Sequence, residues 1–289
     1  MEDHIVRATA ARGGIRAFAA VTKDIVQEAH VIHGTSGVAS AALGRTLTAA
    51  AMISRMFKNK KDVLTIQIKG DGPLGGIIAV SDYQSNVRGY VYNPAADLPL
   101  NEFGKFDVAG AVGKKGYLNV IKDMGMKEPY VGYVNLISGE IGEDLAYYFA
   151  YSEQVPTVIS LGVLVGPDEN VITAGGYIIQ LMPGADEELV KYLEGKVLLT
   201  DSITYMLSEG LDPSAVLEKL LGEKELEITE RVPCRYLCNC TLDRMERNLI
   251  SLGAKELLEM ADEQHGAEIE CHFCSKKYHF SEEDLRRLV

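Results

Sequence analysis

The stretch Cys234-Arg235-Tyr236-Leu237-Cys238-Asn239-Cys240, followed later by Cys271-His272-Phe273-Cys274, holds all five cysteines of the 289-residue chain. Cys238 and Cys240 form a C-x-C pair, and Cys271 and Cys274 form a C-x-x-C pair after a helix-sized insert. Structural zinc sites are closed tetrahedra of four nitrogen or sulfur ligands, and two cysteine pairs supply such a set. The spacing therefore predicts a zinc site formed by Cys238, Cys240, Cys271 and Cys274.

Two other interpretations of these cysteines are less consistent with their surroundings. Inert core cysteines are common, but Asn239 and the neighbouring charges make Cys238–Cys240 a poor core segment. A thioredoxin-like pair would begin a helix, whereas Cys271 follows the alternating, strand-like run Ala267–Glu270 and reads as part of a hairpin turn. Cys234 is a fifth sulfur without an assigned place, either an alternative ligand or a spare thiol.

The composition fits a globular cytosolic protein. Apolar residues make up 47% of the chain, and no apolar run approaches the roughly 20 residues that span a bilayer, so no membrane association is expected. The N-terminus lacks a basic segment followed by an apolar one, so we expect no signal peptide and a cytoplasmic location. Thiols stay reduced in that compartment, which favours metal binding or redox sensing over structural disulfides.

Negative charge is concentrated in the C-terminal third. The net charge is −12, and residues 185–289 hold 23 acidic and 13 basic residues. A zinc module that binds nucleic acid usually presents a basic face to the phosphates. We therefore expect no nucleic-acid partner.

Residues 1–184 read as an α+β domain with a largely antiparallel sheet and packed helices. Val38–Phe57 is rich in alanine and methionine and predicts a helix after a capping stretch.

Gly70–Gly75 matches G-x-G-x-x-G, but β-rich residues follow it, so we predict a turn and no nucleotide site. Gly175-Gly176 indicates a bulge or a close backbone approach. Period-two patterns predict strands at 63–69, 87–92, 117–122, 130–137, 157–165 and 170–181, and Ser138 is expected to cap a helix.

Residues 185–232 read as an acidic helical linker that begins after Pro183-Gly184. The pattern predicts helices at 186–194, 201–208 and 214–221, followed by a charged run at 223–231. Isolated helices shorter than about 12–15 residues are marginal in water. The linker is therefore predicted to be metastable, either docked on the first domain or released from it.

Residues 233–289 read as a small C-terminal module with helices at 244–252 and 254–264 and a last helix capped by Ser281. A core of this size contributes only a few kcal/mol, whereas structural zinc contributes on the order of 10–16 kcal/mol. The metal is thus predicted to decide whether this module folds.

Several co-linear stretches, together with the cysteine pattern, resemble the heat shock protein 33 family, the redox-regulated bacterial holdase chaperones. The resemblance runs nearly end to end, and Cys234 lies outside the family's four-cysteine pattern. The stretches are Gly70–Gly75, Asp97-Leu98-Pro99-Leu100, Ser138-Gly139-Glu140-Ile141-Gly142-Glu143-Asp144, Ser152-Glu153-Gln154 and Gln180-Leu181-Met182-Pro183-Gly184.

The resemblance implies an ATP-independent chaperone, not an enzyme, that holds unfolding client proteins during oxidative stress. It implies one Zn²⁺ per reduced, inactive chain, bound by the two cysteine pairs. Oxidation would form the disulfides Cys238–Cys240 and Cys271–Cys274, release zinc, and unfold the C-terminal module and the linker. A homodimer is expected on activation.

Client binding is assigned to the apolar linker faces as a hypothesis, with the first domain sharing in it. These residues are Leu189, Val190, Leu193, Val216, Leu217, Leu220 and Leu221. The same residues are expected to pack on the first domain at rest. Alternative functions are a zinc-stabilised protein-interaction module, a thiol oxidoreductase, and an enzyme whose site lies in the first domain.

Overall fold

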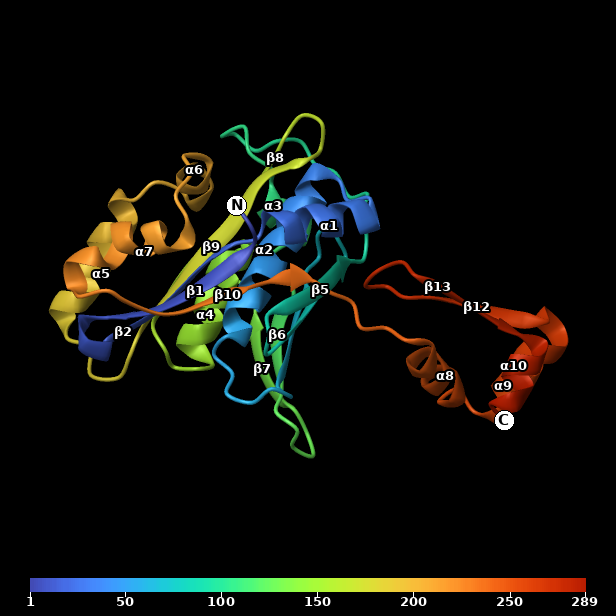
Figure 1. Cartoon of the computed structure of the whole chain (residues 1–289). Helices are drawn as coiled ribbons and strands as arrows, with labels where there is room; N and C mark the ends of the chain where they lie inside the picture. Colours follow the sequence, from blue (N-terminus) through green and yellow to red (C-terminus); the bar gives the residue numbers. More distant parts are fainter. The chain divides into compact units, whose positions relative to one another are not determined.

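Helix α2 (Gly37–Ser54) is the central element of the N-terminal part of the chain. In the computed structural model, which describes all residues 1–289, every α2 residue except Gly37 and Arg45 is buried. The Ser36 hydroxyl caps the helix by accepting from the Ala39 amide. A helix that is apolar all round needs cover on all sides, and α2 packs against strands of two separate sheets (Figure 1).

The two sheets are almost entirely antiparallel, as predicted for an α+β fold. The only parallel pair joins β11 to β5. The first sheet has the order β10 (Glu227–Pro233), β1 (His4–Ala10), β2 (Ile15–Val21), β9 (Val171–Leu181) and β8 (Thr157–Val165). The second has the order β11 (Arg235–Tyr236), β5 (Asn86–Val91), β4 (Ile77–Asp82), β3 (Val63–Lys69), β6 (Tyr117–Asp123) and β7 (Tyr130–Asn135).

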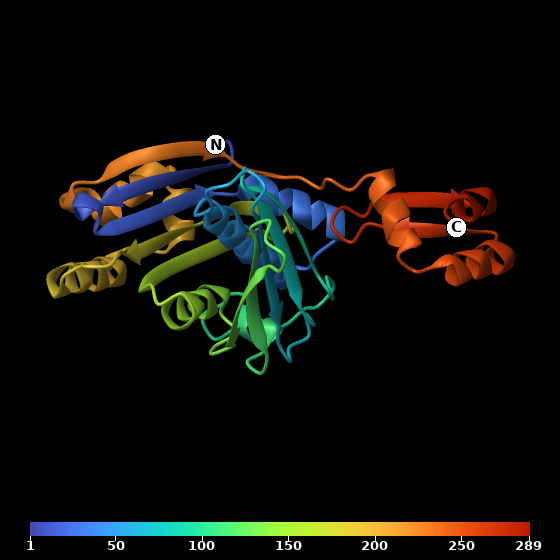
Figure 2. The ribbon, with the colours of Figure 1, turned by 90° about the horizontal axis from the view of Figure 1, so that it is seen from below.

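Helices cover both faces of the first sheet. On one face lie α1 (Lys23–His33), α2 and α4 (Ile141–Tyr151), and the short α3 (Val108–Val112) also packs on α2. On the other face, α6 (Ile203–Ser208) and α7 (Pro213–Leu221) pack on the sheet, and α5 (Glu187–Leu199) joins the same core through Leu189 and Leu193. Figure 1 shows α5, α6 and α7 together beside β9, β1 and β2, and Figure 2 shows this part of the chain, in yellow to orange, in a turned view. The predicted linker is therefore docked in this state.

The chain divides into two compact units, Met1–Tyr236 and Leu237–Val289. The second unit contains α8 (Leu242–Ile250), α9 (Ala254–Gln264), the hairpin β12 (Gly266–Glu270) and β13 (Lys277–Ser281), and α10 (Glu282–Arg287). Ser281 caps α10 in a capping box with Asp284, as predicted. Its core has seven buried apolar residues, from Met245 to Leu285.

Two details differ from the sequence predictions. Ser138 does not cap α4: the N-cap residue is Glu140, and the Ser138 hydroxyl accepts from the Glu140 amide. Asp144, in the first turn, instead accepts from the amides of Ile137 and Ser138. The end of the predicted helical linker is a strand, because residues from Glu227 onward, in the charged run 223–231, form β10 against β1.

Candidate metal centre

The C-x-x-C pair lies in the tight turn that joins β12 to β13. The Cys271 amide donates to the Lys276 carbonyl at 2.9 Å, and the amides of Cys274 and Ser275 both donate to the Cys271 carbonyl. Ser275 takes a left-handed conformation, with φ 55°, that closes the turn. The hairpin predicted from the strand-like run before Cys271 is confirmed, and its turn holds both sulfurs together.

The C-x-C pair lies in the segment directly before α8 and meets the hairpin turn. The Sγ atoms of Cys238 and Cys271 are 3.7 Å apart, and those of Cys240 and Cys274 are 3.4 Å apart. All four sulfurs lie within 4.8 Å of one another. Zn–S bonds of about 2.3 Å in a tetrahedron place the sulfurs about 3.8 Å apart. The four cysteines therefore have the donor type, number and spacing that a structural metal ion needs.

The four thiols are not electrostatically equivalent. Burial raises the pKa of Cys238 and raises that of Cys274 to about 11. Burial also acts to raise the pKa of Cys240, but hydrogen bonds from the Tyr278 hydroxyl and the neighbouring thiols outweigh it and lower the pKa to about 7. The Tyr278 hydroxyl donates to Cys240 Sγ at 3.2 Å. Negative charge is thus held most easily on the Cys240 sulfur.

Cys234 does not belong to this group of sulfurs. It lies between β10 and β11 in the first unit, is buried, and places its Sγ 3.9 Å from the Val21 carbonyl. Burial, and secondarily the Asp3 carboxylate, raise its pKa far above the usual value. A buried thiol of this kind is a poor nucleophile. The three nearby histidines are also outside the group: His265 and His279 pair with Glu282 and Glu268 at the surface, and His272 is exposed.

The predicted client-binding residues lie on the helices that cover the outer face of the first sheet. All are buried except Val190, which is partly exposed. The six buried residues pack against a sheet face that includes Val6, Ala8 and Ile15. Leu198 and Leu199 at the end of α5, which no sequence prediction singled out, are 85% and 87% exposed.

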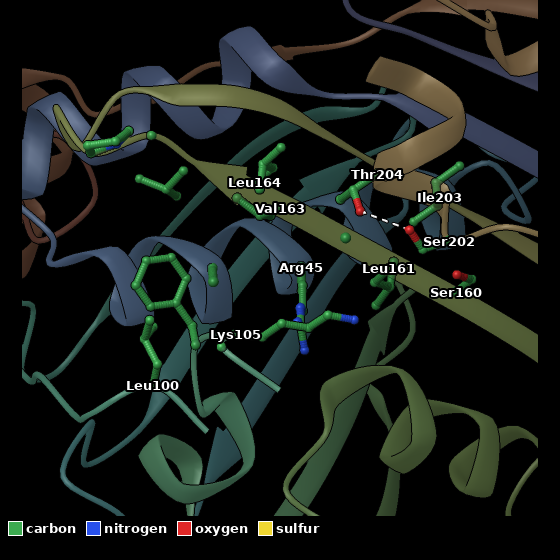
Figure 3. A pocket seen from close by; sticks show the side chains of 17 residues that line it. Arg45, Leu100, Lys105, Ser160, Leu161, Val163, Leu164, Ser202, Ile203 and Thr204 are labelled. Carbon is green, nitrogen blue, oxygen red and sulfur yellow. Dashed lines mark hydrogen bonds between the residues drawn. The ribbon is translucent and has the colours of Figure 1, made fainter. Parts of the chain in front are cut away.

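The same first unit contains a pocket of about 570 Å³ along β8. Its walls are β8, α2, residues near Leu100 and the start of α6, and its charged residues are Arg45 and Lys105 (Figure 3). Arg45 is paired with Glu140. One wall, Ser202–Thr204, thus comes from the predicted linker, so the pocket changes if α6 leaves.

The fold and the site together define a class of protein: an α+β unit with docked helices, joined to a small module built around four thiols. No helix in the chain combines the length and apolarity needed to traverse a bilayer. The family model described as Hsp33 protein matches residues 3–281. The chain belongs to the Hsp33 family.

Relatives and a solved structure agree along the whole length. The 33 kDa chaperonin of Acetivibrio thermocellus is 58% identical over 289 residues, covering 100% of this chain and 97% of the relative. The 33 kDa chaperonin of Ruminiclostridium cellulolyticum is 56% identical, with coverage of 100% and 98%. The crystal structure of the 33 kDa chaperonin from Thermotoga maritima is 39% identical, with a TM-score of 0.91 and coverage of 100% and 98%.

The chain is therefore a chaperone, as the resemblance implied. The α+β class with antiparallel sheets and packed helices is confirmed. The four-cysteine cluster fits a metal-binding module and redox-sensitive disulfide formation, which is consistent with a redox-regulated member of this family.

Proposed function

We propose that this chaperone is an ATP-independent, non-enzymatic holdase of the bacterial cytoplasm, inactive while reduced and bound to one zinc ion per chain. The observation that carries the proposal is the cluster of Cys238, Cys240, Cys271 and Cys274 within 4.8 Å. Zinc, when bound, supplies a tetrahedral crosslink that keeps these sulfurs as thiolates. The division into a client-binding domain at 1–184, a linker at 185–232 and a redox module at 233–289 is part of the proposal.

Oxidation acts on the thiols themselves. A thiolate attacks peroxide to give a sulfenic acid and hydroxide, and a second thiol then displaces the oxygen as water to form a disulfide. Four thiols and two peroxide molecules thus give two disulfides and four waters. Cys238–Cys240 and Cys271–Cys274 are the pairs that the family resemblance favours. Because sulfur contacts of 3.7 and 3.4 Å also cross between the two pairs, disulfide mapping by mass spectrometry is the direct check.

Loss of the ligands is expected to unfold the second unit. Seven buried apolar side chains form its core, and structural zinc contributes on the order of 10–16 kcal/mol to such modules. Helices α6 and α7 are short, and α5 buries only Leu189 and Leu193. Short helices depend on tertiary packing. The linker is therefore the next segment to be released.

Release of the linker exposes two complementary apolar surfaces, the helix faces and the outer face of the first sheet. We propose that unfolded client proteins bind these surfaces, through Leu189, Val190, Leu193, Val216, Leu217, Leu220 and Leu221 on the helices. Dimerisation of the activated chain adds a second copy of each surface. Contiguous exposed apolar patches are typical of interaction sites.

The test uses a variant in which the helix residues of α7 are replaced by serine, Val216→Ser, Leu217→Ser, Leu220→Ser and Leu221→Ser. After peroxide treatment, aggregation of a heat-denatured client is followed by light scattering. The proposal predicts weaker suppression than in the wild type, although the linker is released more easily. Full activity in the oxidised variant would show that these side chains do not bind clients.

A further inference from the structure

Strand β10 occupies an edge of the first sheet that would otherwise be open. It pairs antiparallel with β1, from His4 opposite Pro233 to Thr9 opposite Glu227, with a register shift after Arg7. Figure 1 shows β10 beside β1. We call Glu227–Pro233 the strap. The edge that it covers is more than 200 residues away in the sequence, yet the strap ends only a few residues before Cys238.

The strap is held mainly by backbone pairing, because none of its side chains is fully buried. Five are exposed, including Ile228 at 41%, and Glu230 and Val232 are partly buried. The carbonyls of Asp3 and Arg7 face the strap, since they accept from the Cys234 amide and the Thr229 hydroxyl. Alternation along β1 places the peptide groups of Ile5 and Thr9 on the same side. Such an edge pairs with an extended chain regardless of its sequence.

A few polar contacts hold the strap in place. Glu230 pairs at 2.7 Å with Arg55, whose side chain is only 7% exposed and also donates to the Tyr83 carbonyl. Arg231 binds Asp212 and Ser214 at the start of α7. The strap is therefore coupled to the linker helices through Arg231 and to the buried end of α2 through Glu230. If α7 leaves the sheet, the strap loses one of these anchors.

We propose that the β1 edge is itself a client-binding site, masked by the strap at rest, which takes extended segments of unfolding proteins by antiparallel backbone pairing. This inference rests on the proposed holdase function and deepens it. Backbone pairing suits a chaperone because it does not depend on the sequence of the client. Once α7 is gone, the buried row of Val6, Ala8 and Ala10 becomes an exposed apolar surface beside the edge. Arg55, freed from Glu230, favours an acidic residue in the bound segment.

Two comparisons select this edge and this occupant. The opposite edge, β8, has no neighbouring strand in the resting state, so it cannot by itself explain activity that depends on oxidation. A second copy of the chain is the other candidate occupant, since a homodimer is expected on activation. An extended client segment fits the edge better, because the apolar row of Val6, Ala8 and Ala10 lies beside it and Arg55 offers a positive charge once Glu230 leaves.

The test is residue-resolved amide hydrogen exchange on the full chain. Exchange at Ile5, Arg7 and Thr9 is followed in the reduced zinc-loaded protein, after peroxide, and after peroxide with carboxymethylated, permanently unfolded α-lactalbumin. The proposal predicts protection at rest, at least about tenfold faster exchange after oxidation, and renewed protection with the client. Amides of β3 serve as the internal control.

The outcomes separate this inference from the proposed function. If the three amides stay protected after oxidation while aggregation is suppressed, the strap does not leave and the inference is wrong, but the holdase function stands. If protection returns without client in step with dimer formation, a second chain occupies the edge and the client assignment is wrong. If aggregation is not suppressed at all, the proposed function itself fails.

A pair of strap variants provides an independent check. Glu230→Ala removes the partner of the buried Arg55, whereas Glu227→Ala removes an exposed carboxylate for which no ion pair is observed. Glu230→Ala is expected to speed exchange at Ile5 and Arg7 about tenfold in the reduced state, with unchanged exchange in β3. Glu227→Ala is expected to behave as the wild type. Equal exchange in both variants would contradict the role of the Glu230 anchor.

Discussion

At the scale of single residues, the hydrogen bond from Tyr278 favours the thiolate form of Cys240. Tyr278 donates its hydroxyl proton to Cys240 Sγ while its ring packs in the core of the second unit. Thiolates are the reactive form toward both alkylating agents and peroxide. The hydroxyl therefore acts on reactivity and the ring acts on stability, and a single substitution separates them.

Tyr278→Phe is expected to lower the initial alkylation rate of Cys240 at pH 7 when a zinc chelator and iodoacetamide are added together to the reduced protein, so that labelling begins while the second unit is still folded. The hydroxyl is among the groups that lower the pKa of Cys240 to about 7, so its loss raises that pKa and leaves less thiolate. The measurement is the pH profile of iodoacetamide labelling, resolved by mass spectrometry. A profile that does not move to higher pH would contradict the role given to the hydroxyl.

Asp3 makes the first unit sensitive to pH. Its side chain is buried, its Oδ2 accepts from the Ile25 amide, and its Oδ1 has no partner. Burial raises its pKa to about 6, against the lowering effect of the Ile25 amide. A carboxyl with a raised pKa in the folded state binds its proton more tightly there. The stabilisation is complete below the unfolded pKa of about 3.8 and is lost as the pH rises through about 6.

Asp3→Asn is therefore expected to remove a pH dependence. Relative to Asp3→Asn, the free energy of unfolding of the wild type should fall by a few kcal/mol, on the order of 3, between pH 4 and pH 7. Urea unfolding at several pH values measures the difference. A difference that is constant with pH, or that grows in the opposite direction, would contradict the assignment.

At the scale of elements, two glycines set how firmly the linker helices dock. A Cβ at Gly162 of β8 would lie 2.6 Å from Thr204 and 2.8 Å from Ile203 at the start of α6. A Cβ at Gly195, inside α5, would meet nothing within 4 Å. A Cβ at Gly175 would lie 2.6 Å from Leu207 of α6 and 2.3 Å from the Ala20 carbonyl oxygen, which confirms the close backbone approach predicted for Gly175-Gly176.

Gly162→Val and Gly195→Ala are expected to shift activation in opposite directions. The valine displaces α6 and weakens linker docking by about 1–3 kcal/mol, so less peroxide is needed for holdase activity. The alanine stabilises α5 by about 0.5–1 kcal/mol, so more is needed. Peroxide titrations of client light scattering measure both thresholds. A shift of both variants in the same direction would contradict control by linker docking.

The elements that could be predicted from the sequence are those with local signals. Nearby residues were enough to predict the period-two strands, the helix at 37–54 and the cysteine turn. The meeting of the four sulfurs at the metal centre could be predicted because each cysteine pair has a spacing that metal ligands use. The pairing of β10 with β1 could not be predicted, because its partner is over 200 residues away and its exposed side chains carry no pattern. The burial of Cys234 depends on the same pairing.

At the scale of the whole molecule, the two units differ in how much core supports them. The first unit has two large apolar clusters, whereas the second has seven buried apolar residues around the four cysteines. Small modules of this kind require a metal or disulfides to fold. Metal loss is therefore expected to act on one unit and spare the other.

Chelation of the reduced protein is expected to unfold residues 237–289 and leave the core of residues 1–236 folded. Hydrogen exchange measures this directly, with α9 amides losing protection and β3 amides retaining it. Re-addition of zinc should restore protection in α9. Retained protection in α9 after complete metal removal would contradict the view that the metal decides whether the second unit folds.

The central claim is that oxidation of the four cysteines, loss of zinc and chaperone activity are one event. The most direct measurement follows light scattering of a heat-denatured client with this protein either reduced and zinc-loaded or treated with peroxide at mild heat, while a chromogenic chelator reports released zinc in the same samples. We predict suppression of aggregation only after oxidation, in proportion to the zinc released. Equal suppression in both states, or zinc release without any suppression, would contradict the claim.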